Sequence, residues 1–383
     1  MAGGDTDILI FVEDPGAANV VVDLPRALSK MNLTARIVAA GHAGPYLAAM
    51  GGAHDDAGTA TAAALMDAYA PRLVLAGTSE NPETLGLALI AEAKRRGLAS
   101  VGFADGPAMA DYRFRGRAGD PLAFAPDWVL VPDDATARRF RELGLEPGRV
   151  IACGHPYFDR VRDTGRALAR RGRAAVRADT FPEAPADGRA VVVFLAEISD
   201  GLIPAAFERG GDYTLAGRGD SDRRTDIVLE EVLDAVAPIR PRPYLVLRLH
   251  PKNDEREFAA YAGEIDFISR GGQPLEAVFA ADLVIGMTTS LLFEAALMGC
   301  PALSVIPRPI EAEWQTGIGL GIVRAVHTRD ALRNILPAAI ADPARAMGAP
   351  AEKVIHFGAI GRMADFLAGL LAEGGHPAGG GDD

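Results

Sequence analysis

The sequence predicts an α/β protein made of two doubly wound domains, each with a parallel β-sheet between layers of helices. Short, continuous apolar runs alternate with stretches of helical periodicity along the chain, a pattern typical of parallel sheets buried on both faces. The length of 383 residues exceeds that of one ordinary domain. A segment rich in Arg, Ala and Pro divides the alternation into two series, so we expect two separate sheets.

The first series, residues 1–165, is expected to form the N-terminal domain. Right-handed crossovers join parallel strands, so its helices should cover both faces of one sheet. The predicted strands are Ile8–Val12, Ala35–Ala39, Leu73–Ala76, Ser100–Ala104, Trp128–Val131 and Val150–Ala152. The predicted helices are Val20–Lys30, Thr59–Tyr69, Thr84–Arg96 and Asp134–Leu143.

The second series, residues 190–350, follows a predicted linker at residues 166–189 and precedes a long helix at residues 351–373. Residues 374–383 are rich in Gly and are expected to be a disordered tail. The predicted strands are Ala190–Leu195, Tyr244–Leu249, Leu283–Ile285, Ala302–Val305 and Ile322–Val326. The predicted helices are Ile227–Ala235, Pro274–Phe279, Leu291–Met298 and Arg329–Ile340.

Composition indicates a globular chain without a nucleic-acid partner. Hydrophobic residues make up 49% and charged residues 23% of the sequence, which excludes collagen, coiled coil and wholesale disorder. The net charge is −12, whereas non-specific binding of nucleic acid needs a basic surface. The Asp, Glu and His residues show no metal-ligand spacing, so we expect neither a metal nor a cofactor.

Cysteine usage and hydropathy indicate a cytoplasmic protein. Cys153 and Cys300 lie in separate apolar segments, which excludes a disulfide framework and suits a reducing compartment. The N-terminus lacks the layout of a signal peptide, and no apolar run reaches the ~18 residues of a membrane span. A peripheral position at the inner face of the membrane is compatible with this pattern.

Ligands of such a protein are expected at the carboxyl ends of the strands, in a cleft between the two domains. In the first domain, the turn after Ile8–Val12 contains Asp14, Gly16 and Asn19. Small residues there let a ligand approach the backbone N–H groups ahead of a helix, although a plain turn is the alternative. The turn is not a GxGxxG fingerprint, so dinucleotide binding is not indicated.

Two further polar positions follow strands of the first domain. Asp105 comes after Ser100–Ala104, where a carboxylate can take a proton from a hydroxyl or can simply cap a turn. Gly154 and His155 come after Val150–Ala152, so the imidazole either lines the cleft or bonds to the backbone at a helix start.

The end of the strand Tyr244–Leu249 combines cations with an imidazole. Arg248, His250 and Lys252 are two residues apart, and Pro251 stops the strand where His250 turns toward the cleft. This combination suits the phosphate of a departing nucleotide, whereas a histidine buried in the core is the alternative.

Hydroxyl groups precede the predicted helix Leu291–Met298. Thr288, Thr289 and Ser290 offer hydroxyl and N–H groups to a phosphate at the helix start, although a well-capped helix is the alternative. Glu294 lies four residues after Ser290, a spacing that a capping box does not explain, and its carboxylate suits ribose hydroxyls. The polar residues 199–225 are a candidate substrate lid.

These segments resemble known enzymes. Two Rossmann-like domains, with Glu294, Gly299 and Pro301 in this spacing in the second, resemble the GT-B glycosyltransferase architecture. The pair His250-Pro251 followed by Thr289-Ser290 is similar to the HP and Ser/Thr-Ser motifs of bacterial sialyltransferases, polysialyltransferases and Kdo transferases, which use CMP-sugars.

The resemblance implies a metal-independent glycosyltransferase with a nucleotide-sugar donor and a glycan or lipid-linked acceptor of the cell envelope. It implies that Asp105 is the base, that His250 stabilises the departing nucleotide phosphate, and that the last helix returns to the first domain. The resembling families carry an acidic residue before the Asp-Gly pair, where this sequence has Ala104, so the Glu13-Asp14 pair is the second candidate for the base.

Three alternatives remain open. The HP pair also occurs in CDP-glycerol-type polyol-phosphate transferases. The segment Gly154-His155-Pro156 is similar to one in UDP-GlcNAc 2-epimerases, which have Asn at the position of His155, but the Arg-rich and Glu-Glu signatures of epimerases are missing here. Ala104 favours the third alternative, a non-catalytic protein that binds sugar nucleotides.

Overall fold

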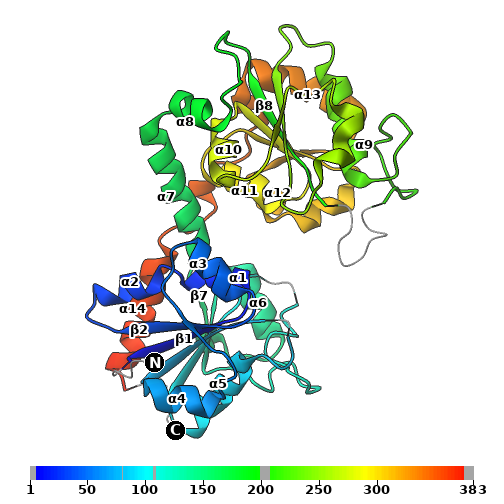
Figure 1. Ribbon diagram of the computed structural model, residues 1–383. Coiled ribbons are helices and arrows are strands. Elements are labelled where there is room, and N and C mark those ends of the chain that lie inside the picture. Colours follow the sequence, from blue (N-terminus) through cyan, green and yellow to red (C-terminus); the bar gives the residue numbers. More distant parts are fainter. Residues whose placement is uncertain (1–5, 80, 107–108, 199–207, 375–383) are drawn as a thin grey trace. The chain divides into compact units, whose positions relative to one another are not determined.

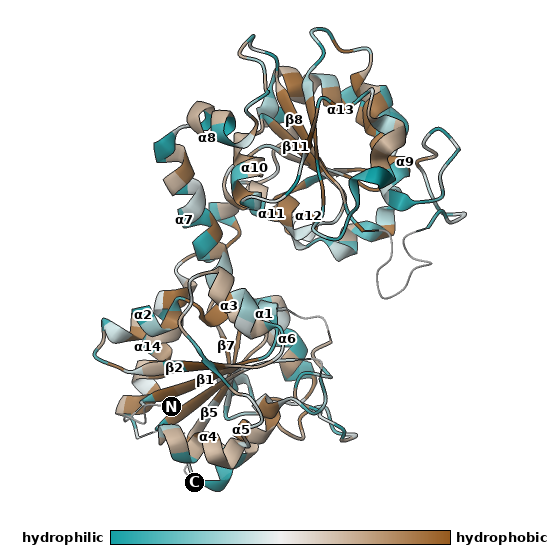
Figure 2. Cartoon of the chain, viewed as in Figure 1, coloured by the Kyte–Doolittle hydropathy of each residue, from teal (hydrophilic) through white to brown (hydrophobic). Residues whose placement is uncertain are grey.

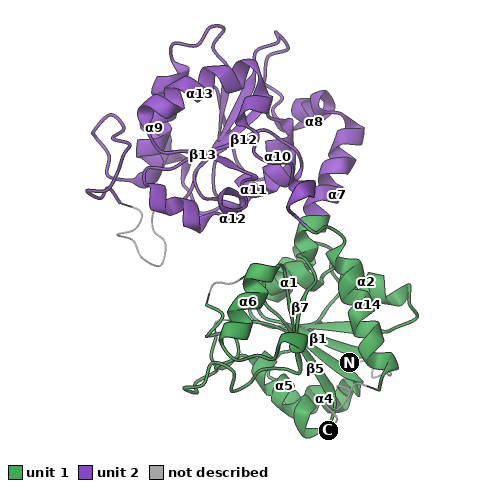
Figure 3. Ribbon diagram, turned by 180° about the vertical axis from the view of Figure 1, so that it is seen from behind, with its two compact units in different colours: residues 1–159, 356–383 green, residues 160–355 purple. Residues whose placement is uncertain are grey.

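The computed structural model describes residues 6–79, 81–106, 109–198 and 208–374 (Figure 1). The chain forms two compact units, one of residues 1–159 and 356–383 and one of residues 160–355 (Figure 3). Each unit is an α/β domain with its own parallel sheet, and this part of the fold prediction is confirmed.

Unit 1 contains a seven-stranded sheet in the order β3-β2-β1-β4-β5-β6-β7, and all of its strand pairs are parallel. The strand order reverses between β1 and β4, which makes the carboxyl ends of these two strands the topological switch point. The strands are β1 (Ile8–Val12), β2 (Ala35–Ala39), β3 (Asp55–Asp56), β4 (Leu73–Gly77), β5 (Ala99–Phe103), β6 (Trp128–Val131) and β7 (Val150–Ala152).

Helices cover both faces of this sheet. Ile8, Ile10 and Val12 of β1 share a core with α1, α2, α3 and α14, whereas Leu9 and Phe11 face α4 and α5. The helices are α1 (Pro15–Val21), α2 (Leu24–Ser29), α3 (Ala43–Ala49), α4 (Ala62–Tyr69), α5 (Leu85–Arg95), α6 (Asp134–Glu142) and α14 (Ala359–Ala372). A 3₁₀ turn, Pro147–Arg149, precedes β7.

Unit 2 contains a six-stranded parallel sheet in the order β10-β9-β8-β11-β12-β13, so its switch point lies between β8 and β11. The strands are β8 (Val191–Leu195), β9 (Tyr244–Arg248), β10 (Phe267–Ser269), β11 (Leu283–Gly286), β12 (Ala302–Val305) and β13 (Arg324–Val326). The α-helices are α7 (Pro156–Arg171), which begins in unit 1, α8 (Arg173–Thr180), α9 (Arg224–Val236), α10 (Pro274–Ala280), α11 (Ser290–Leu297), α12 (Thr316–Gly319) and α13 (Arg329–Ala341). The 3₁₀ helices are Glu255–Tyr261, Pro309–Trp314, Pro343–Ala346 and Ala351–Lys353.

The two faces of the second sheet have different covers. Leu245 and Leu247 of β9 lie in the core beneath α9 and α13, whereas α8, α10 and α11 pack together on the opposite face. In Figure 2 the central strands of both units, such as β1 and β8, are mainly brown, and the helices carry both colours. This contrast in hydropathy follows from position, because a strand between two helical layers is buried on both sides, whereas a helix exposes one face to solvent.

The predicted linker at 166–189 contains the end of α7 and all of α8, and residues 181–189 after α8 form neither helix nor strand. Val176 and Phe181 are buried, and the Arg177 guanidinium donates to the Ala280 carbonyl at 2.8 Å and to Asp282 at 2.7 Å. Composition suggested a linker because the segment is polar, but α8 packs against α10.

The predicted helix at 351–373 begins later, at Ala359, after the 3₁₀ turn Ala351–Lys353. It belongs to unit 1, where Met363 and Leu367 enter the core and α14 packs against α2. Gly358, with φ +94°, precedes it, and this left-handed residue prevents the helix from extending toward the 3₁₀ turn. The expected tail lies outside the described residues except for Gly374.

Candidate functional site

A carboxylate that the sequence analysis did not identify lies at the switch point of unit 2. Glu197 follows β8, and its Oε1 accepts the N–H groups of Met287, Thr288 and Thr289 at 2.9, 2.8 and 3.0 Å. The Thr288 hydroxyl donates to Oε2 at 3.0 Å. The backbone N–H groups before α11, which were expected to hold a ligand phosphate, therefore bind a side chain of the protein itself.

Arg224 holds Glu197 in place. The Arg224 side chain is fully buried, and it donates to Glu197 Oε2 at 3.0 Å and to Glu311 Oε2 at 2.5 and 2.8 Å. Arg308 donates to the other oxygen of Glu311 at 2.9 Å. Burial pushes the pKa of Arg224 down, but the two carboxylates outweigh it and hold the pKa above its usual value. Two carboxylates and two guanidinium groups thus neutralise one another.

The start of α11 leaves Ser290 as the exposed hydroxyl. Thr289 is the N-cap of the helix, and its Oγ1 accepts the Leu291 N–H at 3.3 Å. Ser290, the first helical residue, is exposed, and Glu294 is half-buried one turn further along the same helix. The predicted hydroxyl cluster therefore divides into Thr288 and Thr289, which stabilise the turn, and Ser290, which a ligand can reach.

His250 has a defined hydrogen-bonding arrangement. Its Nδ1 accepts the Lys252 N–H at 3.2 Å, while its own backbone N–H donates to Asn253 Oδ1 at 3.1 Å. A neutral ring in this arrangement carries its proton on Nε2. The side chains of Pro251 and Lys252 are exposed beside it. His250 follows β9 and Ser290 follows β11, strands that flank β8 and are therefore ~10 Å apart.

In unit 1, the structure brings together two of the predicted segments. Asp105 follows β5, and its Oδ1 accepts from Arg113 Nη2 at 3.0 Å. A Cβ atom at Gly16 would lie 2.9 Å from Asp105 Oδ2, so only a glycine lets the first turn approach this carboxylate so closely. Pro107, which follows the Asp105-Gly106 pair, lies outside the described residues.

His155 lies near the same carboxylate. Its ring stacks on Phe158 with 4.5 Å between centroids and meets the edge of Phe103 at 5.8 Å. Burial lowers the pKa of His155 to about 4, against the opposing effect of Asp105 and Asp133. The ring is therefore neutral at pH 7, and because its Nδ1 accepts the Tyr157 N–H at 3.2 Å, the proton lies on Nε2.

The other candidates of unit 1 lie in or beside α1 and differ in their hydrogen bonds. Asn19 Oδ1 accepts the Tyr46 hydroxyl at 3.0 Å, which ties α1 to α3. Asp14 precedes α1, and its side chain makes no capping hydrogen bond to that helix. Glu13, the neighbour of Asp14, accepts from Asn81 Nδ2 at 2.8 Å through Oε1, and its Oε2 is buried without a hydrogen-bond partner among the described residues.

The segment from Gly154 to Asp159 holds the C-terminal helix in place. Gly154 has φ +85°, and a Cβ there would lie 2.7 Å from the His356 carbonyl. Asp159 accepts the N–H groups of Gly358 at 2.6 Å and Ile360 at 3.3 Å, at the start of α14. Gly154 and Asp159 therefore have a structural role that needs no ligand. His155 remains the candidate functional residue of this segment.

The described residues contain neither a membrane-spanning helix nor a metal-binding cluster. No helix in that part of the chain is long and apolar enough to cross a bilayer. The same residues contain no group of three or more His, Cys, Asp or Glu side chains placed to hold a metal ion.

Comparison with known proteins identifies similar folds. No protein-family model and no curated protein sequence matches this chain. UDP-GlcNAc 2-epimerase from Neisseria meningitidis, solved with UDP-GlcNAc, has a TM-score of 0.65 and 13% identity over 96% of this chain and 100% of its own. The epimerase from Methanocaldococcus jannaschii also has a TM-score of 0.65 and 13% identity, over 95% of this chain and 99% of its own.

A wall teichoic acid polymerase, TagF, has a TM-score of 0.50 and 11% identity over 96% of this chain and 89% of its own. At these identities the likeness concerns the fold alone. The chain therefore has the two-domain α/β fold of GT-B type, which an epimerase and a polymerase share.

Proposed function

We propose that this protein is a metal-independent glycosyltransferase that takes its sugar from a nucleotide-sugar donor bound on unit 2. The observation that carries the proposal is the arrangement at His250. Its Nδ1 accepts the Lys252 N–H, so a neutral ring carries its proton on Nε2, and this N–H is the donor that the proposal assigns to the ligand phosphate. This donor lies at the carboxyl edge of a doubly wound sheet, where such folds bind nucleotides.

The proposed reaction is a direct displacement at the anomeric carbon. The acceptor hydroxyl oxygen forms a new bond to this carbon, and its proton passes to the Asp105 carboxylate. The bond between the anomeric carbon and the phosphate oxygen breaks, and the nucleotide leaves with the electron pair. His250 Nε2–H and the Ser290 hydroxyl donate to the phosphate oxygens as their charge increases.

The resemblance of the His250-Pro251 and Thr289-Ser290 pairs suggests a nonulosonic acid, such as sialic acid or Kdo, as the sugar. The acceptor under this proposal is a cell-envelope glycan or its lipid-linked precursor. The reaction would take place in the cytoplasm or at the inner face of the membrane.

A UDP-GlcNAc 2-epimerase is the second candidate, because two proteins of that name share the fold over nearly the whole chain. Epimerisation at C2 breaks and re-forms the C2–H bond, which needs protein acids and bases beside the sugar. Asp105 is salt-bridged to Arg113, and the His155 ring is neutral. A displacement needs a single base, which Asp105 would supply.

The test separates the two reactions by the atoms they exchange. The protein is incubated in D₂O with CMP-, CDP-, UDP- and GDP-sugars, with and without glycan acceptors. A transferase releases nucleotide, extends the acceptor and incorporates no deuterium into the sugar carbons. An epimerase incorporates deuterium at C2 without any acceptor.

Binding is measured first by thermal unfolding with each nucleotide, since a ligand at 100 times its Kd stabilises the folded state by ~2.7 kcal/mol. Binding without release or exchange would replace the proposal by a non-catalytic sugar-nucleotide-binding function.

A further inference from the structure

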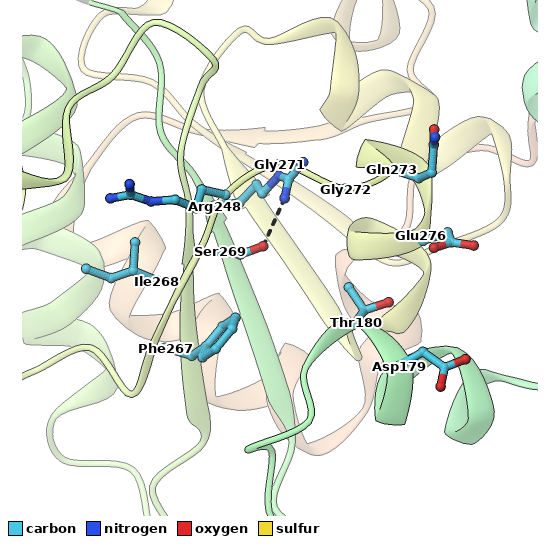
Figure 4. Close-up of a pocket in the computed structure, with 11 residues that line it drawn as sticks. Asp179, Thr180, Arg248, Phe267, Ile268, Ser269, Gly271, Gly272, Gln273 and Glu276 are labelled. Carbon is cyan, nitrogen blue, oxygen red and sulfur yellow. Dashed lines mark hydrogen bonds between the residues drawn. The ribbon is translucent and has the colours of Figure 1, made fainter. Parts of the chain in front are cut away.

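Arg248 is a buried cation that faces a cavity of unit 2. It ends β9, is 8% exposed, and lies on the side of the sheet opposite Leu245 and Leu247, toward α8 and α10. The cavity has a volume of about 260 Å³ and is entirely contained in unit 2 (Figure 4). Its walls include Asp179, Thr180, Phe267, Ser269, Gly271 and Glu276.

Among the described residues, the Arg248 guanidinium has one hydrogen-bond partner, and this partner is neutral. Its Nη1 donates to the hydroxyl of Ser269, the residue opposite it on β10, at 3.0 Å, as Figure 4 shows. None of the ion pairs found among the described residues includes Arg248. Burial lowers its pKa, and no neighbouring charge opposes this effect.

The carboxylates in the cavity wall are already paired elsewhere. Asp179 and Glu276 both accept from Arg171, at 2.6 and 2.7 Å. The Arg270 guanidinium is paired with Glu255. None of these carboxylates pairs with Arg248, which has the neutral Ser269 hydroxyl as its side-chain partner and further N–H groups that can reach the cavity.

A buried guanidinium without a counterion is unfavourable, because a charge removed from water needs a partner of opposite sign. Two places along the carboxyl edge of this sheet differ in this respect. At the start of α11, Glu197 supplies the anion for the N–H groups and Arg224 completes its neutralisation. At the ends of β9 and β10, the cation is present and the anion is missing.

We propose that this cavity binds an oxyanion, a phosphate or carboxylate group of a ligand, through Arg248 and Ser269. The planar guanidinium donates two parallel hydrogen bonds to such a group. The Ser269 hydroxyl, whose oxygen accepts from Arg248, has its own hydrogen to donate to the same anion. Gly271 and Gly272 line the cavity and have no side chain that could block it, and a Cβ at either would meet nothing within 4 Å.

The inference rests on the proposed function only for the origin of the oxyanion, which is either the donor nucleotide or a separate small ion. The site itself depends on charge and geometry. It is therefore tested by binding, whatever the outcome of the transfer assay.

The test compares the wild type with Arg248→Met, which removes the charge and keeps a similar apolar length. Inorganic phosphate, titrated at constant ionic strength, is expected to raise the thermal unfolding midpoint of the wild type in a saturable manner. Arg248→Met should bind phosphate about tenfold more weakly or worse, the usual loss for a charge-assisted hydrogen bond. Ser269→Ala should weaken binding by a smaller factor.

In phosphate-free buffer, Arg248→Met should be as stable as the wild type or more stable, because it removes a buried charge that lacks a partner. A purely structural arginine would behave in the opposite way. Arg242→Met, just before β9, is the matched control, since Arg242 pairs with Asp266 at 2.7 Å. This control should lose stability and keep the response to phosphate.

The proposal is overturned if the wild type shows no saturable phosphate response, or if Arg248→Met keeps it. The source of the anion is identified by comparing the binding of each nucleoside with that of its nucleotide, cytidine with CMP and uridine with UDP. If the donor phosphate fills the cavity, Arg248→Met weakens the binding of the nucleotides and leaves the binding of the nucleosides unchanged. If only inorganic phosphate is affected, the cavity takes a separate oxyanion.

Discussion

The two sheets of this protein share a strand order, but the polar groups at the carboxyl ends of their strands differ in burial and pairing. In unit 2, the switch point is filled by the buried Glu197–Arg224–Glu311 cluster, which satisfies the N–H groups before α11. In unit 1, the corresponding edge carries the partly exposed Asp105–Arg113 pair and a neutral His155. A doubly wound sheet therefore predicts where polar groups gather, but not whether they serve a ligand or the fold.

This difference assigns separate tasks to the two edges. Buried, mutually neutralised charges cost stability when one partner is removed, whereas exposed groups contribute little to stability and remain available for chemistry. Mutations at the unit 2 cluster should therefore act on folding. Mutations at Asp105 and His250 should act on turnover with the fold intact.

The largest effect is expected at the proposed base. Asp105→Asn keeps the shape of the side chain and removes its ability to accept a proton, so turnover should fall by ~10²–10⁴-fold, the range for removing acid–base catalysis. Nucleotide binding, measured by thermal shift, should change little because the proposed donor site lies on unit 2.

Asp134→Asn, on the exposed surface of α6, is the matched control and should remain active. Full activity of Asp105→Asn with an inactive Asp14→Asn would move the base to the first turn. If both variants remain active, neither carboxylate is the base.

The next effect concerns stability. Arg224→Met leaves Glu197 and Glu311 buried with an uncompensated charge, and the free energy of unfolding should fall by about 3–5 kcal/mol. Urea unfolding measures this loss. Arg139→Met, at an exposed pair on α6, should leave the midpoint nearly unchanged. A loss no larger than that of the control would show that the cluster does not stabilise unit 2.

His250→Ala should lower turnover by about 10²–10³-fold, the usual cost of removing one hydrogen-bond donor to a developing oxyanion. The free energy of unfolding should stay close to that of the wild type. His42→Ala, which changes an exposed histidine of unit 1, is the control. Unchanged kinetics of His250→Ala would mean that this imidazole only shapes the turn after β9.

The smallest expected effect is the pH dependence caused by His155. Its pKa is about 4 in the folded protein and ~6.5 when unfolded, so between these values only the unfolded chain binds the proton. Stability is therefore lost as the pH falls from ~6.5 to ~4, by on the order of 3 kcal/mol from this group.

Urea unfolding at pH 7 and pH 4.5 should show a smaller difference for His155→Gln than for the wild type. Equal differences would contradict the assignment of a neutral, buried ring, because both proteins contain the same carboxylates.

Several strands could be predicted to the residue because their local pattern is unambiguous. Ile8–Val12 and Trp128–Val131 are continuous apolar runs bounded by polar residues, and the structure has both at the predicted bounds. β3 is only Asp55–Asp56 and β10 only Phe267–Ser269, so neither has enough apolar sequence to be recognised. Both are edge strands, held by pairing with a neighbour rather than by their own burial.

The candidate site residues likewise divide into those that could be predicted from the sequence and those that could not. Polar residues after strands, such as Asp105 and His250, could be found because their place in the pattern is visible in the sequence. Glu197 has the same signal, directly after the apolar run Val191–Leu195. It was missed because its ion-pair partner Arg224 lies 27 positions away and the N–H groups that it accepts lie 90 or more positions away along the chain.

The sequence by itself determined the α/β class, the two sheets and the edge at which polar groups gather. These properties follow from the local alternation of apolar and polar residues, which burial on both faces of a sheet imposes. Only the tertiary structure decided which charges neutralise one another. It paired Glu197 with Arg224 and left Arg248 without an anion, because ion pairing depends on distances between segments that no local pattern records.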